Sequence, residues 1–517
     1  MFWHVKSHDI SYSILTKKTT LKIIFCYFCK KKYMENLSKI LIMCKMLLMN
    51  THNYNSIKNF IRKIEGLAEV ICFAIIYFQI WIIFYRHVSG ENTFFGNGKF
   101  ILIGIYAILV YILFFYCDAF KFGYLKFVDA LTAQWIALVI VNIITYFQIS
   151  LIATHILNPL PMILLTVIEF ALCIVFVYLF TYIYHRMYVP KNMLMIYGNK
   201  KAITLKIKME KRSDKYHISK VISAFSNREK LKEEIRKHDA VVINDVPAEI
   251  RNDILKYCYG EKIRAYVVPK ITDIIISGSE DINLFDTPLF LVKGTGPTLM
   301  QLAMKRLCDI ILCIIALIPG LPIMLVVAIA IKLDSKGPVF FRQERVTRNG
   351  NTFEILKFRS MIEGAEKDGV AHPAEDEDPR ITRVGKRIRK NRIDELPQIF
   401  NILKGDMSIV GPRPERLEHY EKYSKEVPEF YYRTKVKGGL TGYAQIYGKY
   451  NTSPYDKVRL DLMYIENYSL ILDLKLILMT LPTLLKREST EGFDKIIQVE
   501  EVVHLLEEEK AEQDAQI

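Results

Sequence analysis

Four long apolar runs occupy roughly the first 190 residues of the chain. They cover residues 66–88, 99–120, 133–157 and 159–183. Each run is close to the roughly 20 residues that an α-helix needs to cross the hydrocarbon core of a bilayer. The pattern therefore predicts a bundle of four membrane-spanning helices within residues 51–187.

The basic side chains around these runs predict an orientation. They gather before the first run, between the second and third, and after the fourth. These residues are Lys58, Arg62, Lys63, Lys121, Lys126, Arg186 and Lys191. The other two loops hold little more than Arg86 and Lys99. Because Lys and Arg favour the cytoplasmic side, both ends of the bundle are expected in the cytoplasm.

Residues 188–297 have a different pattern, in which short apolar runs alternate with charged helical pieces. MLMIYGN, AVVINDV and RAYVVPK are typical of short strands. The alternation predicts a small Rossmann-like domain with a parallel sheet. After Gly198, however, the sequence is GNKKAIT, which holds one of the three glycines of a dinucleotide-binding turn. A structural or regulatory role is therefore favoured over nucleotide binding.

A fifth apolar run extends from Ile310 to Ile331 and has Pro319, Gly320 and Pro322 at its midpoint. Each proline removes a helical hydrogen bond and clashes with the preceding turn. Basic residues lie on both sides of the run: Lys305, Arg306, Lys332 and Lys336. We therefore predict a re-entrant hairpin over 305–335, a helix, a break and a helix that return to the same side. A full span with a proline kink is the alternative, and it would place residues 335–490 outside the cell.

The composition is typical of a membrane protein that binds anionic groups. The 517 residues are 51% hydrophobic and carry a formal net charge of +15. Beside long apolar runs, this charge favours lipid headgroups or a phosphorylated substrate over nucleic acid. The nine cysteines show no disulfide framework, and the C-x-x-C at Cys26 and Cys29 has no second pair at zinc spacing.

A cluster of arginines precedes an acidic pair in the C-terminal half. The arginines are Arg380, Arg383, Arg387, Arg389 and Arg392, and Arg413 follows in a proline-bounded turn. Arginine forks match phosphate oxygens two at a time, as a diphosphate substrate would require. The alternative is a solvated or lipid-facing basic helix.

The acidic pair is Asp394 and Glu395, at the start of ELPQIFNIL. This segment predicts a short helix with Asp394 at the cap position and Pro397 in the first turn. A helix N-terminus attracts phosphate, so an aspartate nucleophile there would face a partly stabilised phosphorus. When it is ionised, Glu395 accepts hydrogen bonds and donates none. Carboxylate oxygens of this kind suit Mg²⁺.

Seven motifs carry a specific family resemblance. They are KRLCDI, KLDSKGPVFFRQERV, KFRSM, DPRITRVG, DELPQ, LKGDMSIVGPRPE and GLTGYAQ. With them, residues 301 to about 487 resemble the catalytic domain of bacterial polyprenyl-phosphate sugar-1-phosphate transferases, the monotopic phosphoglycosyl transferases. Four spans and an α/β domain ahead of it resemble the long form of that family. The resemblance implies an α+β catalytic domain, here 298–487, that contains the re-entrant hairpin.

The resemblance also implies residue roles. Asp394 would attack the nucleotide sugar and carry the phospho-sugar, while Glu395 would bind Mg²⁺. Substrate and phosphate contacts are expected at Lys357, Arg359, Arg380, Arg383, Arg389, Arg413 and Asp473, and the membrane-hairpin break at Pro322. Three positions depart from the family pattern: Leu321, Gly438 and Tyr447. None of them touches the acidic pair.

The expected activity is transfer of a sugar-1-phosphate from a UDP-sugar to undecaprenyl phosphate, through a phospho-aspartate. The products would be UMP and undecaprenyl-diphosphate sugar, in the first membrane step of exopolysaccharide, capsule or O-antigen synthesis. The expected partners are the two substrates, Mg²⁺ and the lipid bilayer, without nucleic acid, and a homodimer is left open. The protein is expected to be a multi-pass protein of the inner or plasma membrane, with its catalytic domain on the cytoplasmic face. A non-catalytic scaffold or regulator and a nucleotide sensor are the alternatives.

The two ends of the chain carry no expected catalytic role. Residues 1–50 are a basic leader to which no function is assigned. Residues 488–517 predict an acidic amphipathic helix, either solvated or in contact with a partner.

Overall fold

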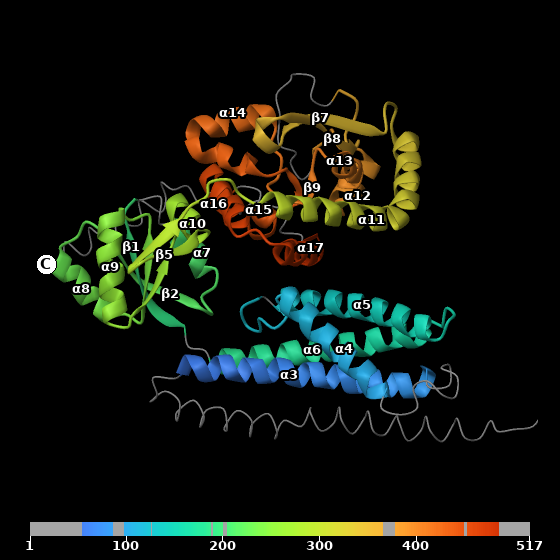
Figure 1. The fold of residues 1–517 in the computed structure, drawn as a ribbon, viewed down its shortest axis with the longest axis horizontal. Helices are drawn as coiled ribbons and strands as arrows, with labels where there is room; N and C mark the ends of the chain where they lie inside the picture. The colour runs from blue at the N-terminus through green and yellow to red at the C-terminus, as the bar shows by residue number, and fades with distance from the viewer. Residues whose placement is uncertain are drawn as a thin grey trace, which may run out of the picture. The chain divides into compact units, whose positions relative to one another are not determined.

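A computed structural model describes residues 54–85, 98–125, 127–187, 190–199, 204–364, 378–448 and 452–484. The chain divides into two compact units at Pro190 (Figure 1). The expectations for the leader and for the acidic tail fall outside the described residues.

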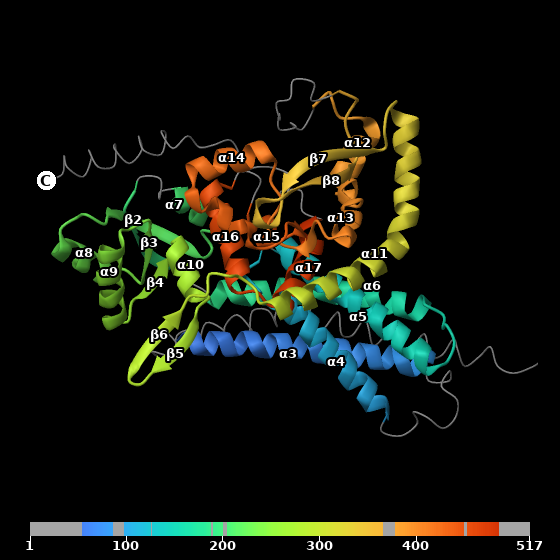
Figure 2. The ribbon, with the colours of Figure 1, turned by 45° about the horizontal axis from the view of Figure 1, so that its top comes forward.

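The first unit consists of long apolar helices (Figure 2). They are α3 (Tyr54–Ile80), continued by the π-helical turn η1 (Trp81–Tyr85), α4 (Gly98–Tyr116), α5 (Phe127–Ile152) and α6 (Leu160–Met187). By length and composition, all four are apolar enough to cross a membrane. This confirms the four predicted apolar helices, although α3 begins before the first predicted run.

Polar side chains are buried inside this bundle. The Tyr106 hydroxyl contacts the carboxylate of Glu169, and Asn142 Nδ2 donates to the same carboxylate at 2.7 Å. Gln134 Nε2 donates to Glu69 Oε2 at 3.1 Å, and both of these side chains are fully buried. Because lipid tails compete for apolar contacts, such hydrogen bonds help to fix which helix faces which.

The second unit begins with an α/β domain, as predicted. Its strands are β1 (Lys191–Tyr197), β2 (Tyr216–Ser223), β3 (Ala240–Asn244) and β4 (Arg264–Val267), all parallel in the order β2-β1-β3-β4. Its helices are α7 (Thr204–Glu210), α8 (Arg228–Arg236), α9 (Ala248–Gly260) and α10 (Ile271–Ser277). An antiparallel hairpin that the sequence did not predict follows, β5 (Glu280–Leu284) and β6 (Thr287–Leu291).

Gly198, the single glycine of the expected turn, has a packing role. A Cβ at this position would lie 2.1 Å from the Asp245 carbonyl oxygen. The loop after β1 therefore approaches the loop after β3 too closely for any side chain. Gly198 is explained by this contact alone, without a bound nucleotide.

The remaining domain is α+β and surrounds the arginine cluster. Its strands are β7 (Phe340–Val346) and β8 (Thr352–Phe358), which are antiparallel, and β9 (Ser408–Val410) and β10 (Gly439–Thr441), which are parallel. Its helices are α11 (Leu299–Asp334), α12 (Arg383–Lys390), α13 (Gln398–Lys404), α14 (Leu417–Glu426), α15 (Tyr443–Tyr447), α16 (Pro454–Glu466) and α17 (Leu470–Leu484). Three 3-10 segments complete it: η3 (Arg348–Gly350), η4 (Ile393–Glu395) and η5 (Pro428–Lys435).

Helix α11 contains the fifth apolar run. It is one helix of 36 residues with Pro319 and Pro322 inside it, so no gap in the helix marks the predicted break, and the re-entrant course stays a prediction. Figures 1 and 2 instead show α11 bending into two arms. Proline is the usual cause of such a bend, because the helical hydrogen bonds on either side of the missing one can persist.

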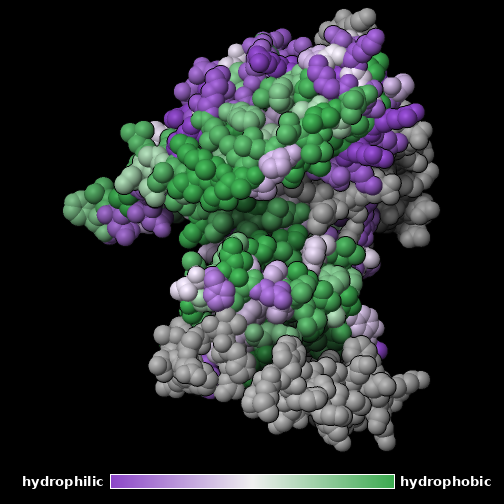
Figure 3. All heavy atoms as spheres, turned by 90° about the vertical axis from the view of Figure 1, so that its right-hand side faces the viewer, coloured by the Kyte–Doolittle hydropathy of each residue, from purple (hydrophilic) through white to green (hydrophobic). Residues whose placement is uncertain are grey.

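Both arms of α11 pack against the same domain. In the first arm, Cys313 packs in a buried cluster with Phe353 and Ile355. In the second arm, Ile331 packs with Phe358 and Ile388. The opposite side of α11 is exposed and apolar, and Figure 3 shows hydrophobic side chains gathered on this side of the molecule. These exposed residues include Leu307, Ile311, Ile314, Ile315, Ile318, Leu321, Leu325, Val326, Ile329 and Leu333.

Candidate active site

The acidic pair lies in the 3-10 turn η4, which follows a strained residue. Arg392 adopts a left-handed conformation, with φ of 55°, and turns the chain from α12 into η4. Helix α13 begins only at Gln398, with Pro397 at its cap position. The expectation that Asp394 caps this helix is therefore wrong. Tight 3-10 hydrogen bonds, such as Leu396 N to Ile393 O at 3.1 Å, involve the residues around the pair instead.

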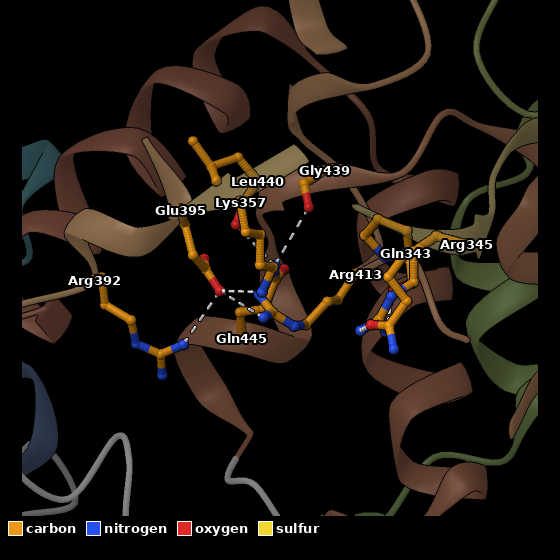
Figure 4. A network of polar contacts seen from close by, with 10 residues as sticks. Gln343, Arg345, Lys357, Arg392, Glu395, Arg413, Gly439, Leu440 and Gln445 are labelled. Atoms are coloured by element: carbon orange, nitrogen blue, oxygen red, sulfur yellow. Dashed lines mark hydrogen bonds and ion pairs between the residues drawn. The ribbon is translucent and has the colours of Figure 1, made fainter. Parts of the chain in front are cut away.

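Glu395 is held by three cations (Figure 4). Its Oε1 lies 2.8 Å from Arg413, 3.1 Å from Lys357 and 3.7 Å from Arg392. The residue is 8% exposed. Burial alone would raise the pKa of Glu395, but the charges of Arg413 and Lys357 hold the pKa well below its usual range. We therefore expect Glu395 to be ionised at neutral pH.

Asp394 has a contrasting environment. Its Oδ1 is buried and has no hydrogen-bond partner among the described residues. Burial, helped by the charge of Glu395, raises the pKa of Asp394 above its usual value, against the opposing charges of Lys357, Arg392 and Arg389. Two neighbouring carboxyl groups with opposite pKa shifts are suited to different chemical roles.

Lys357 reaches the pair from β8, where it lies opposite Phe341 of β7. Burial lowers the pKa of the Lys357 ammonium, and the charge of Glu395 opposes this effect. Arg413 comes from the turn between β9 and α14. The nearby charge of Glu395 raises the pKa of Arg413 despite burial. Lys357 and Arg413 thus both lie against Glu395, and their roles in substrate binding stay a prediction.

Of the other predicted cations, Arg380 and Arg359 have hydrogen-bond partners of their own. Arg380 forms a bidentate pair with Asp378, with nitrogen–oxygen distances of 2.6 and 2.9 Å. Arg383 is exposed at the start of α12. Arg389 lies close enough for its charge to lower the pKa of Asp394. Arg359 is buried, and its Nη2 donates to the carbonyl and hydroxyl oxygens of Ser335, at the end of α11.

Asp473 contacts the first turns of α11. Its Oδ2 accepts from Lys305 Nζ at 2.7 Å, and its Oδ1 accepts from the Tyr464 hydroxyl at 2.8 Å. Pro322, the expected break of the membrane hairpin, lies inside the continuous helix α11.

Three residues near the pair were missed by the sequence reasoning. Gln445 Nε2 donates to the carbonyl oxygens of Gly439 and Leu440, while its Oε1 is buried without a described partner (Figure 4). Arg345 and Arg433 are the others. Gln445 and Arg345 lie inside matched motifs, GLTGYAQ and KLDSKGPVFFRQERV, so the motifs themselves carried a signal.

The oxygen atoms of the pair fit a magnesium ion. Among the described residues, no group of three or more His, Cys, Asp or Glu side chains could form an all-protein metal site. Magnesium, however, often binds one or two carboxylates together with substrate phosphates and water. All three cations contact Oε1 of Glu395, and the unpartnered Oδ1 of Asp394 lies on the adjacent residue.

Comparison with known proteins places this geometry in a family. A family model described as bacterial sugar transferase matches residues 300–487. The chain is 39% identical over 260 residues to a UDP-N-acetylgalactosamine-undecaprenyl-phosphate N-acetylgalactosaminephosphotransferase of Aeromonas hydrophila, a match that covers 48% of this chain and 59% of that protein.

Two further relatives are UDP-glucose:undecaprenyl-phosphate glucose-1-phosphate transferases. The Klebsiella pneumoniae protein is 38% identical over 247 residues, covering 47% of this chain and 51% of the relative. The Caulobacter vibrioides protein is 40% identical over 211 residues, covering 39% of this chain and 78% of the relative. The match thus spans a little over half the length of the Aeromonas and Klebsiella proteins, and most of the Caulobacter protein. The chain belongs to the bacterial sugar transferase family.

Proposed function

We propose that this protein transfers a sugar-1-phosphate from a UDP-sugar to undecaprenyl phosphate. The observation that carries the proposal is the unequal pair: Glu395 is fixed by three cations, while Asp394 Oδ1 is buried and unpartnered. A carboxylate oxygen that accepts no hydrogen bond does not have to break one when it attacks an electrophile. The names of the relatives support the lipid acceptor and the class of reaction.

The first step is an attack by an Asp394 oxygen on the phosphorus that carries the sugar. A bond forms between this oxygen and phosphorus, and the bond from phosphorus to the bridging oxygen breaks, so that UMP leaves with the electron pair. In the second step, a phosphate oxygen of the lipid attacks the same phosphorus. The Asp394 carboxylate then leaves, and a polyprenyl-diphosphate sugar is released.

The surrounding cations supply the electrostatic part of the catalysis. Phosphoryl transfer depends mainly on positioning and on stabilising charge that develops on phosphate oxygens. Arg413 and Lys357 are fixed beside the pair by Glu395, so they need not reorganise during the reaction. When Mg²⁺ is bound by Glu395 and Asp394, it would add a further positive charge at the diphosphate.

The course of α11 supports a lipid acceptor that arrives from the membrane plane. Lys305 and Asp334 near its two ends both bond to the same domain, through Asp473 and the Val384 amide. A straight helix of 36 residues would extend about 54 Å, which exceeds the thickness of the hydrocarbon core. We propose that the bent α11 enters one leaflet and returns, with the catalytic domain in the cytoplasm.

The test is to trap the covalent intermediate. Purified protein in lipid is incubated with a UDP-sugar and Mg²⁺ but without lipid acceptor, and the peptide that contains Asp394 is analysed by mass spectrometry. We expect this peptide to gain the mass of a sugar phosphate, with release of about one UMP per protein. Asp394→Asn should give neither, while remaining folded. Full UMP release by Asp394→Asn would refute the mechanism.

A further inference from the structure

Arg345 is a partly buried cation without an acidic partner. It lies on β7, and the antiparallel register places Arg345 opposite Phe353 and Phe341 opposite Lys357. Opposite residues share a face of the sheet and side chains alternate along a strand, so Arg345 and Gln343 lie on the same face as Lys357. This is the face from which Lys357 reaches Glu395.

The hydrogen bonds of Arg345 go to neutral acceptors. Its Nη2 donates to Gln343 Oε1 at 2.6 Å, and its Nη1 donates to the Pro414 carbonyl oxygen at 3.2 Å. Its Nε is buried with no partner. None of the ion pairs found among the described residues includes Arg345, so its charge is not compensated there.

The electrostatic surroundings agree with an uncompensated charge. Burial, reinforced by the charges of Arg413 and Arg416, lowers the pKa of Arg345 to about 10. The acidic groups that oppose this shift, Glu415 and Glu395, are not in ion-pair contact with it. Keeping an unpaired charge out of water is expensive, and an anion that binds next to it removes much of the cost.

Arg433 provides a comparison within the same domain. It is 5% exposed, and its guanidinium pairs with Asp461 at 2.8 Å and with Glu415 at 3.4 Å. The charges of these carboxylates raise the pKa of Arg433 in spite of burial. Arg433 thus has carboxylate partners, whereas Arg345 has amide and carbonyl oxygens.

We propose that Arg345 is a binding residue for a phosphate group of a substrate, and that Gln343 and the Pro414 carbonyl hold its guanidinium in place for that group. The inference rests on the proposed function, because it assigns a further ligand contact to the same site. Pro414 follows Arg413 directly, so the two guanidinium groups flank one turn. A planar fork with an unpartnered Nε matches the oxygens of phosphate.

Gln343→Glu is the sharpest variant, because it changes one amide to a carboxylate of nearly the same shape. The new carboxylate would pair with Arg345 and compete with the substrate phosphate. If Arg345 binds phosphate, Gln343→Glu should weaken binding without unfolding the protein. If Arg345 only supports the turn at Pro414, the added ion pair should leave binding unchanged.

The experiment measures UDP binding by calorimetry, and the KM values for UDP-sugar and for undecaprenyl phosphate from UMP release. Protein in lipid nanodiscs is compared as wild type, Gln343→Glu and Arg345→Gln. Arg342→Gln is the matched control, since Arg342 lies on the same strand but is exposed and pairs with Glu354 at 3.3 Å. Each variant is used only if its thermal unfolding resembles that of the wild type.

We expect the two test variants to weaken phosphate binding by about tenfold to a hundredfold, the range of a charged hydrogen bond, and Arg342→Gln to change it little. A higher KM for UDP-sugar together with weaker UDP binding assigns the donor diphosphate, and a higher KM for the lipid alone assigns the acceptor phosphate. Unchanged UDP binding and KM values would overturn the inference. Absence of UMP release by the wild type with every donor would instead refute the proposed function.

Discussion

Arg433 Nη2 donates to the main-chain carbonyl oxygen of Arg413 at 3.0 Å. The same guanidinium pairs with Asp461 and Glu415. Arg433 therefore holds in place the backbone of Arg413, the cation closest to Glu395. Arg433 touches neither the acidic pair nor, in the proposed mechanism, the reacting atoms. It is a positioning residue.

Replacing Arg433 should therefore act through Arg413. Arg433→Met leaves Asp461 buried without its ion-pair partner, while Glu415 keeps Lys457 at 3.1 Å, and this should cost about 3–5 kcal/mol of unfolding free energy. Arg433→Lys keeps the positive charge but loses the planar guanidinium that pairs with both carboxylates. In the protein that remains folded at low temperature, we expect Arg433→Lys to lower kcat more than tenfold with a smaller change in donor KM. Equal kcat for the folded Arg433→Lys variant and the wild type would contradict the positioning role.

The three cations around Glu395 should differ in their importance. Arg413 and Lys357 donate hydrogen bonds to Oε1 at 2.8 and 3.1 Å, whereas Arg392 lies 3.7 Å away, beyond hydrogen-bond distance. A hydrogen bond to a charged group contributes about 1.5–3 kcal/mol, while a longer, solvent-exposed ion pair contributes about 0–1 kcal/mol. We expect Arg392→Met to lower the melting temperature least. The melting temperatures are measured by thermal unfolding in detergent. This order would be rejected if Arg392→Met lowered the melting temperature more than Arg413→Met or Lys357→Met.

The sequence predicted elements with strong periodicity and predicted the site largely through resemblance. The four apolar helices and the parallel sheet follow from hydrophobic patterns, and KFRSM, DELPQ and GPRPE indicated Lys357, Glu395 and Arg413 together. The turn at Arg392 was missed, because a left-handed arginine has no local signature, and Asp394 was consequently placed at a helix cap. Arg345 and Arg433 were missed because the chain has 70 lysines and arginines. Arg345 lies within a matched motif, but only the strand register shows that it shares a face with Lys357, and only its buried partners distinguish Arg433.

Metal removal should abolish the proposed transfer. In the proposed mechanism, Glu395 and Asp394 would provide oxygen ligands, which favour Mg²⁺ over zinc or copper. We expect excess EDTA to stop UMP release, Mg²⁺ to restore it fully and Mn²⁺ to restore it in part. The thermal unfolding temperature should change little, since the described residues hold no all-protein metal site. Undiminished turnover in EDTA would exclude a metal from the reaction.

The proposed course of α11 places β7 in the cytoplasm. Glu344 is exposed on β7, so Glu344→Cys offers a thiol to a membrane-impermeant reagent. With intact cells we expect no labelling above the background of the native cysteines, and efficient labelling after permeabilisation. Asn92→Cys, between the first and second apolar runs of the sequence, is the positive control because the basic residues predict that it is outside. Labelling of Glu344→Cys in intact cells would show that α11 crosses the membrane.

The buried pair of Lys305 and Asp473 permits a test of whether Asp473 contributes to stability or to substrate binding. The two side chains are 7% and 11% exposed, and Tyr464 completes the contacts of the Asp473 carboxylate. If the pair fixes α11 to α17, Asp473→Leu or Lys305→Met alone should each cost about 3–5 kcal/mol of unfolding free energy, because one charge is left buried. The double variant should cost less unfolding free energy than either single one, since no unpaired charge remains.

We expect the folded double variant to keep at least about a tenth of the wild-type kcat/KM, a loss within about 1.4 kcal/mol. If Asp473 binds substrate, the double variant should instead be stable and inactive, which chemical denaturation and UMP release would show together.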